Sequence, residues 1–240
     1  MTEPFTMAGY CALLATLRDR GHAFRGFDDA EPGSAHVVLR HDVDMALGPA
    51  VEMAAAEQGM GASATYFVLL RSELYNPFAP ESVQAMTAIR ALGHEIGLHL
   101  DASLCGEEPE ALDRAAGREC AMLEQMAGHP VRMISFHRPA KSLLGHAADL
   151  AGRRHAYQPR FFSAMGYCSD SRGAWHHGAP LDHPAIAAGT ALQLLTHPIW
   201  WARPDVEPQA RLHAFLERRH ARLDRALAEN CDIHVPRTMQ

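Results

Sequence analysis

Residues 36–44 have the sequence HVVLRHDVD, which joins a strand pattern to a polar cluster. The first part, residues 36–40, is a β-branched and apolar run that is typical of a buried strand. The second part, His41-Asp42-Val43-Asp44, follows at the carboxyl end of that run. The sequence therefore predicts a strand that ends in a pair of carboxylates.

Patterns of helix and strand alternate after this strand. Apolar residues at helical spacing, with Pro at the starts and Gly at the ends, predict helices. Short apolar runs between them predict buried strands. This alternation is typical of an α/β fold, with a parallel sheet and helices outside it. The predicted helices are 48–59, 81–92 and 110–126, and the predicted strands are 64–70, 95–98 and 131–136.

The remaining chain completes one predicted domain over residues 1–240. Helices are expected near both ends, over about residues 6–20 and 208–229, and a strand over residues 192–195. Residues 155–189 are rich in Gly, Pro and His, which predicts loops around one or two short strands. Because no linker divides the chain, the motif-bearing core, about residues 36–200, belongs to that single domain.

Composition excludes several classes of protein. The chain has 240 residues, 48% hydrophobic and 21% charged, as in ordinary globular proteins. Its net charge of −6 provides no electrostatic reason to expect nucleic-acid binding. No secretory signal or membrane-spanning run is evident. The five cysteines are odd in number and widely spaced, so we expect free thiols in a reducing cytoplasm.

Several of the 16 histidines follow predicted strands. His99, His137 and His197 each come at the end of such a strand, as Asp42 and Asp44 do. The carboxyl ends of strands in a parallel barrel share one face, where enzymes of that architecture place their chemistry. We therefore expect these side chains to form one site.

Asp42 and Asp44 are separated by one residue, so both side chains point to the same side of a strand. Two such carboxylates repel, and burial would raise the pKa of one of them. A cation would resolve this by taking one as a ligand and leaving the other as a base. An alternative is that the pair caps the helix that begins near Pro49.

Histidine nitrogens from two strand ends would complete a metal site. His99 and His137 are the natural partners of one carboxylate, and three protein ligands with an open position are typical of catalytic zinc. His197, on a further strand end, is expected to act as a general acid.

The ordered motifs resemble the polysaccharide deacetylase family, also called the NodB-homology group or carbohydrate esterase family 4. The branch they resemble most is that of the WbmS-like deacetylases of lipopolysaccharide O-antigen loci. The resemblance extends over about residues 36–200. The matching motifs are RHDVD (40–44), ATYFV (64–68), GHEIGLH (93–99), FHRP (136–139), DSRGAW (170–175) and LLTH (194–197).

This resemblance implies a distorted, incomplete TIM-like (β/α)7 barrel that binds a divalent metal. The metal would be Zn²⁺, with Co²⁺, Ni²⁺ and Mn²⁺ also compatible with such ligands. The implied activity is removal of an N-acetyl or other small acyl group from a sugar or a sugar-linked precursor. Removal of a formyl group, opening of a cyclic amide and a catalytically inactive sugar-binding protein are the alternatives.

The resemblance also implies roles for individual residues. Asp42 would be the general base and His197 the general acid, with Asp44 and His99 as metal ligands. Arg138 would orient Asp42. The remaining implied pocket residues are Asp170 and Trp175.

One position departs from the family pattern. The family usually has a second histidine ligand where this chain has Ser103, so the third ligand must come from elsewhere. His137 is the first choice and Asp101 the second. The aromatic residues expected near the rim, where they would face a sugar ring, are Tyr66, Tyr167, Trp175 and Trp200.

Overall fold

The computed structural model describes residues 5–105, 108–176, 178–202 and 206–236. The chain divides into two compact units, one up to residue 202 and one from residue 203. The first unit contains the sheet and every candidate site residue. The second contains the helix α7 (Pro208–Asn230), close to the predicted bounds. The single domain predicted over residues 1–240 stays a prediction.

A curled parallel sheet organises the first unit, as predicted. Seven strands follow one another in the order β6-β5-β4-β3-β2-β8-β7, and β1 pairs with β2 beside this path. Every pair of neighbouring strands is parallel, so the carboxyl ends lie at one edge. The strands are β1 (Ala23–Phe24), β2 (His36–Val43), β3 (Ala64–Leu69), β4 (Glu95–Asp101), β5 (Met133–His137), β6 (Arg154–His155), β7 (Gly166–Ser169) and β8 (Leu192–Thr196).

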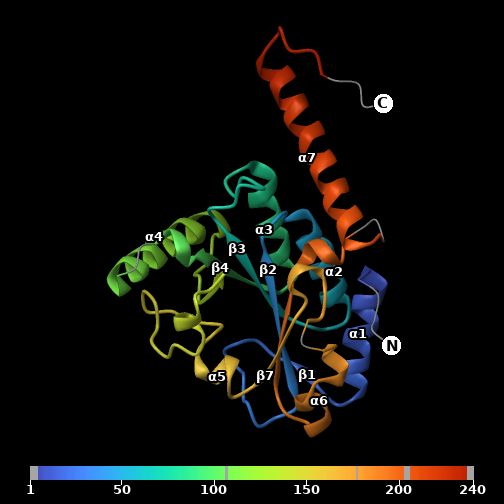
Figure 1. Ribbon diagram of the computed structural model, residues 1–240, viewed down its shortest axis with the longest axis vertical. Coiled ribbons are helices and arrows are strands. Elements are labelled where there is room, and N and C mark those ends of the chain that lie inside the picture. The colour runs from blue at the N-terminus through green and yellow to red at the C-terminus, as the bar shows by residue number, and fades with distance from the viewer. Residues whose placement is uncertain (1–4, 106–107, 177, 203–205, 237–240) are drawn as a thin grey trace. The chain divides into compact units, whose positions relative to one another are not determined.

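Helices lie outside the strands (Figure 1). The helices predicted before residue 130 are present, and their ends differ from the predicted ones by at most one residue. The α-helices of the first unit are α1 (Met7–Asp19), α2 (Gly48–Gly59), α3 (Pro80–Ala91), α4 (Pro109–Ala127), α5 (Pro159–Phe162) and α6 (Pro184–Ala188). Short 3₁₀ turns are η1 (Ala102–Leu104), η2 (Lys141–Leu143), η3 (Ser171–Gly173), η4 (Pro180–Asp182) and η5 (Pro198–Trp200).

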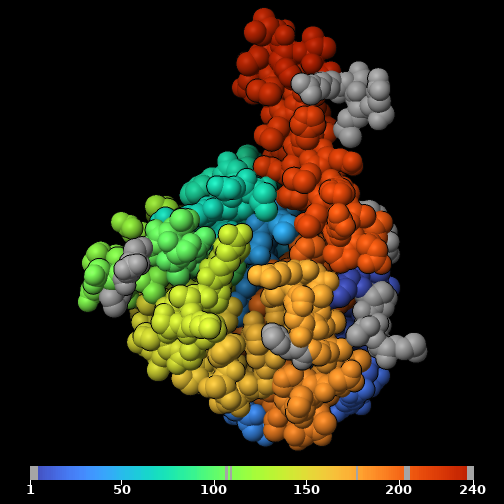
Figure 2. Space-filling model, in the orientation of Figure 1, coloured from blue at the N-terminus to red at the C-terminus, as the bar shows by residue number. Residues whose placement is uncertain are grey.

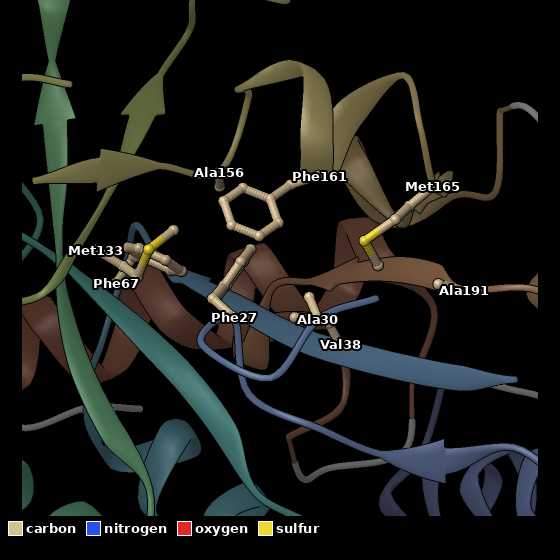
Figure 3. Packing of buried hydrophobic residues seen from close by; sticks show 9 residues of the cluster. All are labelled: Phe27, Ala30, Val38, Phe67, Met133, Ala156, Phe161, Met165 and Ala191. Atoms are coloured by element: carbon tan, nitrogen blue, oxygen red, sulfur yellow. The ribbon is translucent and has the colours of Figure 1, made fainter. Parts of the chain in front are cut away.

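The inner face of the sheet is built in layers. At the amino ends of the strands lies an apolar cluster that includes Val38 and Phe67, and the side chains of Phe27 and Phe161 meet edge to face (Figure 3). Arg40 and then Asp42 follow Val38 on the same side of β2, because side chains alternate along a strand. The core therefore supports a polar layer at the carboxyl ends.

Gly97, the second glycine of the GHEIGLH motif, is required by close packing in this core. A Cβ at this position would lie 2.5 Å from Cδ1 of Phe67, which is closer than carbon atoms can approach. Phe67 is paired with Gly97 across β3 and β4. The glycine thus lets the phenyl ring cross the inner face beneath His99.

The outer face of β2 and β3 carries a buried polar network centred on Glu57 of α2. Its Oε1 accepts hydrogen bonds from Tyr10 Oη (2.5 Å) and His41 Nε2 (2.7 Å), and its Oε2 accepts one from Tyr66 Oη (2.6 Å). The other ring nitrogen of His41 is 2.7 Å from Thr196 Oγ1. This network joins α1 and α2 to three neighbouring strands directly behind Asp42.

Glu57 is fully buried and its pKa is lowered. Burial acts to raise the pKa of the carboxyl, but His41 and the hydroxyls of Tyr10 and Tyr66 outweigh burial. Burial and Glu57 in turn raise the pKa of both tyrosines, which keeps their hydroxyls as donors. The network is therefore arranged around a charged carboxylate.

Replacing Glu57 with Gln is expected to lower the free energy of unfolding by about 1–3 kcal/mol at pH 7, because three buried side chains lose hydrogen bonds to a charged acceptor. A carboxyl whose folded-state pKa is lowered stabilises the fold above its unfolded pKa, about 4.3 for Glu. That contribution disappears as the pH falls through the folded-state pKa. Urea denaturation of both proteins from pH 7 to pH 3 should show their difference narrowing below about pH 4. A constant difference would show that the charge of Glu57 does not matter.

In the described part of the chain, no helix combines the length and the apolar composition needed to cross a membrane.

Candidate active site

A cavity of about 520 Å³ opens at the carboxyl ends of the strands. Asp42, Asp44, His99, His137 and His197, the residues expected to share a site, all line it. Figure 2 shows the surface hollowed between the yellow-green and light-orange segments, with blue atoms deep between them. The predicted convergence of strand ends is therefore present in the structure.

Three side chains in this cavity form a possible metal site. One ligand atom from each of Asp44, His99 and His137 can be chosen so that all lie within 4.8 Å of one another. Oδ1 of Asp44 is 3.1 Å from Nε2 of His99 and 3.4 Å from Nδ1 of His137. The three residues come from the ends of β2, β4 and β5.

The geometry of these atoms fits a small cation. Asp44 Oδ1 is buried, and among the described residues no donor forms a hydrogen bond with it. Zinc bound tetrahedrally at about 2.0–2.1 Å would place its ligand atoms about 3.3–3.4 Å apart. Two of the three separations, 3.1 and 3.4 Å, are close to this spacing, and all three are within 4.8 Å. An imidazole–carboxylate donor set of this kind suits zinc and its first-row neighbours.

Ser135 connects His99 to Asp42. Nδ1 of His99 is 2.5 Å from Ser135 Oγ, and that hydroxyl donates to Asp42 Oδ1 at 3.2 Å. Because the hydroxyl proton is directed to Asp42, Ser135 accepts the Nδ1 proton of His99. This leaves the Nε2 lone pair of His99 facing Asp44, which is the usual arrangement of a metal-binding histidine.

Arg40, and not Arg138, holds the carboxylate of Asp42. Its Nε and Nη2 donate to Asp42 Oδ1 (3.0 Å) and Oδ2 (2.8 Å). The same guanidinium donates to Gln193 Oε1 (3.2 Å) and Tyr157 Oη (3.0 Å). The role expected for Arg138 is thus corrected. Its side chain is exposed and lines the cavity. The arginine that orients Asp42 is the buried one two residues before it in the sequence.

The electrostatics of the two aspartates also differ from the expectation. Burial acts to raise the pKa of Asp42, but the guanidinium of Arg40 outweighs it, and the pKa is lowered. The pKa of Asp44 is likewise held well below its usual range, because interactions with His137 and the positive charge of His197 outweigh burial. Neither pKa is raised by repulsion between the pair. The helix-cap alternative is wrong as well, since α2 has no side-chain cap.

His197 and Asp170 form a second hydrogen-bonded pair in the site. Nδ1 of His197 is 2.6 Å from Asp170 Oδ1, while Nε2 points toward Asp44 Oδ2 at 3.8 Å. The indole of Trp201 also donates to Asp170 Oδ2 at 2.8 Å. Burial acts to lower the pKa of His197, but Asp170 outweighs it and raises the pKa to about 9. The imidazole is therefore protonated at neutral pH.

Asp101, the second choice for the third metal ligand, forms hydrogen bonds with Ser103. Its Oδ1 accepts hydrogen bonds from the amide (3.1 Å) and the hydroxyl (2.6 Å) of Ser103. This places Asp101 as the cap of the short turn η1. Of the two alternatives for the third ligand, the geometry favours His137.

Two of the four expected rim residues lie elsewhere. Tyr167 and Trp200 line the cavity. Tyr66 is opposite His41 on the outer face of the sheet, where it contacts Glu57. Trp175 stacks on Phe5, with ring centroids 5.6 Å apart, and is not among the described residues that line the cavity. The pocket roles of Tyr66 and Trp175 are therefore corrected.

Arg40 and Ser135 are site residues that the sequence analysis did not assign. Both are on the inner side of strands, two residues before a predicted site residue: Asp42 for Arg40 and His137 for Ser135. The alternation of side chains along a strand is the signal that could have found them.

Comparison with known proteins adds only distant similarities. No family model and no curated protein matches the chain. Solved structures similar to it are CE4 family carbohydrate esterases and deacetylases. A CE4 family pseudoenzyme from Bacillus anthracis has a TM-score of 0.45 and 13% identity, over 78% of this chain and 63% of that chain.

Two others have comparable scores. The Streptococcus pyogenes deacetylase PplD, in complex with acetate, has a TM-score of 0.44 and 15% identity, covering 83% of this chain and 82% of that one. A family 4 acetyl xylan esterase from Clostridium thermocellum, in complex with cobalt, has a TM-score of 0.41 and 15% identity, covering 76% of this chain and 84% of that one.

Proposed function

We propose that this protein is a metal-dependent hydrolase that removes an N-acetyl or similar small acyl group from a sugar or sugar-linked compound. One observation carries the proposal: the possible metal site of Asp44, His99 and His137 shares a cavity with Asp42 and His197. A carboxylate base, an imidazolium acid and a metal site are together the groups that amide hydrolysis by water requires.

Asp44, His99 and His137 would hold the metal, and Zn²⁺ is the proposed ion. When bound, a divalent cation acidifies water and polarises a carbonyl group. Ser135 keeps the His99 ring in the required tautomer through the 2.5 Å contact with Nδ1. The open side of the site faces the cavity, where the acyl group would bind.

Asp42 and His197 would move the protons. Asp42 accepts a proton from the attacking water, and Arg40 keeps the carboxylate ionised and oriented through both of its oxygens. His197 gives its Nε2 proton to the leaving amine, which completes the cleavage of the C–N bond. Asp170 is the positioning residue, since it holds Nδ1 of His197 and stabilises the imidazolium.

Aromatic side chains would bind the sugar. Tyr157, Tyr167 and Trp200 line the cavity, and aromatic faces suit the apolar faces of sugar rings. Nε1 of Trp200 is a buried donor without an acceptor among the described residues. A hydroxyl or carbonyl oxygen of the bound substrate would satisfy it.

The proposal is tested by incubating zinc-loaded protein with N-acetylated, N-formylated and O-acetylated sugars. We expect acetate release from N-acetylated sugars, loss of this activity after chelation and its return with added zinc. Product analysis of free acetate and of the new amine provides the measurement. Release of formate alone would establish a deformylase, and protein that binds zinc but hydrolyses none of these sugars would contradict the proposed activity.

A further inference from the structure

Two arginines that the proposed chemistry does not use line the same cavity. Arg138 directly follows β5, and Arg172 lies in η3, just after β7. β5 and β7 are on opposite sides of the curled sheet, separated in strand order by β4, β3, β2 and β8. Both side chains are exposed. The arginines therefore flank the open side of the cavity.

Neither guanidinium has a partner among the described residues. Arg138 and Arg172 form no hydrogen bond or ion pair there, whereas the buried Arg40 is bound to Asp42, Gln193 and Tyr157. Arg40 already binds both oxygens of Asp42, the carboxylate that Arg138 was expected to orient. Both arginines are available to a ligand.

The backbone holds both arginines in an unusual conformation. φ is 49° at Arg138 and 62° at Arg172, in the left-handed region that favours glycine. Of the described non-glycine residues, only Ala151 shares this feature. Strained backbone of this kind persists where the surrounding structure enforces it, and it clusters at ligand-binding sites.

The charges of the cavity are unbalanced in the direction of positive charge. Asp42 is neutralised by Arg40, and Asp170 by His197. Asp44 is the remaining carboxylate among the described lining residues, and it would face a divalent cation. Arg138 and Arg172 therefore contribute positive charge that no group of the site compensates.

We propose that Arg138 and Arg172 form an oxyanion subsite at the mouth of the cavity, and that the substrate is an acylated sugar carrying a carboxylate or phosphate group. Only one part of this proposal, that the ligand is an acylated sugar, rests on the proposed function. Arginine suits both anions, because its planar fork donates two parallel hydrogen bonds to carboxylate or phosphate oxygens.

The test is binding, measured by calorimetry. The probes are N-acetylglucosamine, its 1-phosphate and the corresponding N-acetylated uronic acid, with zinc-loaded and chelator-treated protein. We expect at least one anionic probe to bind about tenfold or more tightly than the neutral sugar, as charge-assisted hydrogen bonds allow. Persistence of this preference in chelator-treated protein would assign it to the arginines instead of the metal. Comparison of the sugar phosphate with the uronic acid shows which of the two anionic groups the arginines bind.

Substitution of both arginines by Asn should abolish this preference. Asn tolerates a positive φ better than most residues, so Arg138→Asn/Arg172→Asn is expected to unfold at the temperature of the wild type. Arg114→Gln, which removes an exposed positive charge from α4, is the matched control and should keep the preference.

The proposal is overturned if wild-type protein binds neither anionic probe more tightly than the neutral sugar. It is also overturned if the doubly substituted protein retains the preference. Because no turnover is needed, the two proposals fail separately. Anion preference without hydrolysis would contradict the hydrolase alone, and hydrolysis of neutral sugars without anion preference would contradict the subsite alone.

Discussion

Asp42→Asn is expected to lower kcat/KM by roughly 10²–10⁴-fold, the usual contribution of a general base. The amide of Asn cannot accept a proton from water, although it keeps the size of the carboxylate. Zinc content should stay unchanged, because Asp42 lies outside the group formed by Asp44, His99 and His137. Steady-state kinetics and metal analysis of the same preparation measure both effects.

Asp42→Asn is also expected to lower the free energy of unfolding, because Asp42 neutralises Arg40. Both side chains are almost completely buried, and removal of one partner from such a pair costs about 3–5 kcal/mol. The double variant Arg40→Gln/Asp42→Asn removes both charges and should recover part of this loss while staying inactive. Asp42→Asn protein that is folded and retains wild-type kcat/KM would contradict the base assignment.

His137→Ala is expected to weaken zinc binding at least about 100-fold, since loss of an outer-shell partner alone costs 10–100-fold. His137 supplies a ring nitrogen 3.4 Å from Asp44 Oδ1, and the part of the chain that the structure describes offers no other group of three ligands. Activity should fall to background at zinc concentrations that saturate the wild type. Competitive zinc titration with a chromophoric chelator provides the affinity.

Asp101→Asn is the matched control for this substitution. Asp101 also lies at the end of β4 and is opposite His137 across the β4–β5 ladder, but its side chain is bound to Ser103. Zinc affinity should therefore stay within a fewfold of wild type. If Asp101→Asn loses zinc and His137→Ala retains it, the ligand assignment is wrong.

The regular part of the fold could be predicted from the sequence because its signals are strong and local. The strand predicted at residues 36–40 is a run of β-branched and apolar residues, and helix α2 has Pro49 near its start and Gly59 at its end. Between residues 140 and 190 the elements are short: β6 has 2 residues and β7 has 4. Such strands are held by their neighbours β5 and β8, so their own sequence carries little signal.

The site, too, could be predicted from the sequence only in part. Placement after a strand was enough to bring Asp42, Asp44, His99, His137 and His197 together, because parallel strands share one carboxyl edge. Which face a side chain occupies depends on register, and β3 is buried on both faces, so its pattern does not show which residues face the site. Tyr66 illustrates this limit: its pairing with His41 places it on the outer face, behind the site.

The sequence also does not predict which side chains of the site form hydrogen bonds with each other. Arg40 precedes Asp42 in RHDVD and Arg138 belongs to the separate FHRP motif, yet Arg40 is the arginine that donates to both oxygens of Asp42. Similarly, Ser135 contacts His99 because β5 lies next to β4 in the sheet. These contacts are set by strand order.

The most direct test of the metal site is anomalous scattering from crystals grown with zinc, recorded on both sides of the zinc absorption edge. We expect one strong peak at about 2.0–2.2 Å from an Asp44 oxygen, His99 Nε2 and His137 Nδ1, with Asp42 outside the coordination sphere. A peak held by other residues, or no peak among these three in zinc-saturated crystals, would contradict the account.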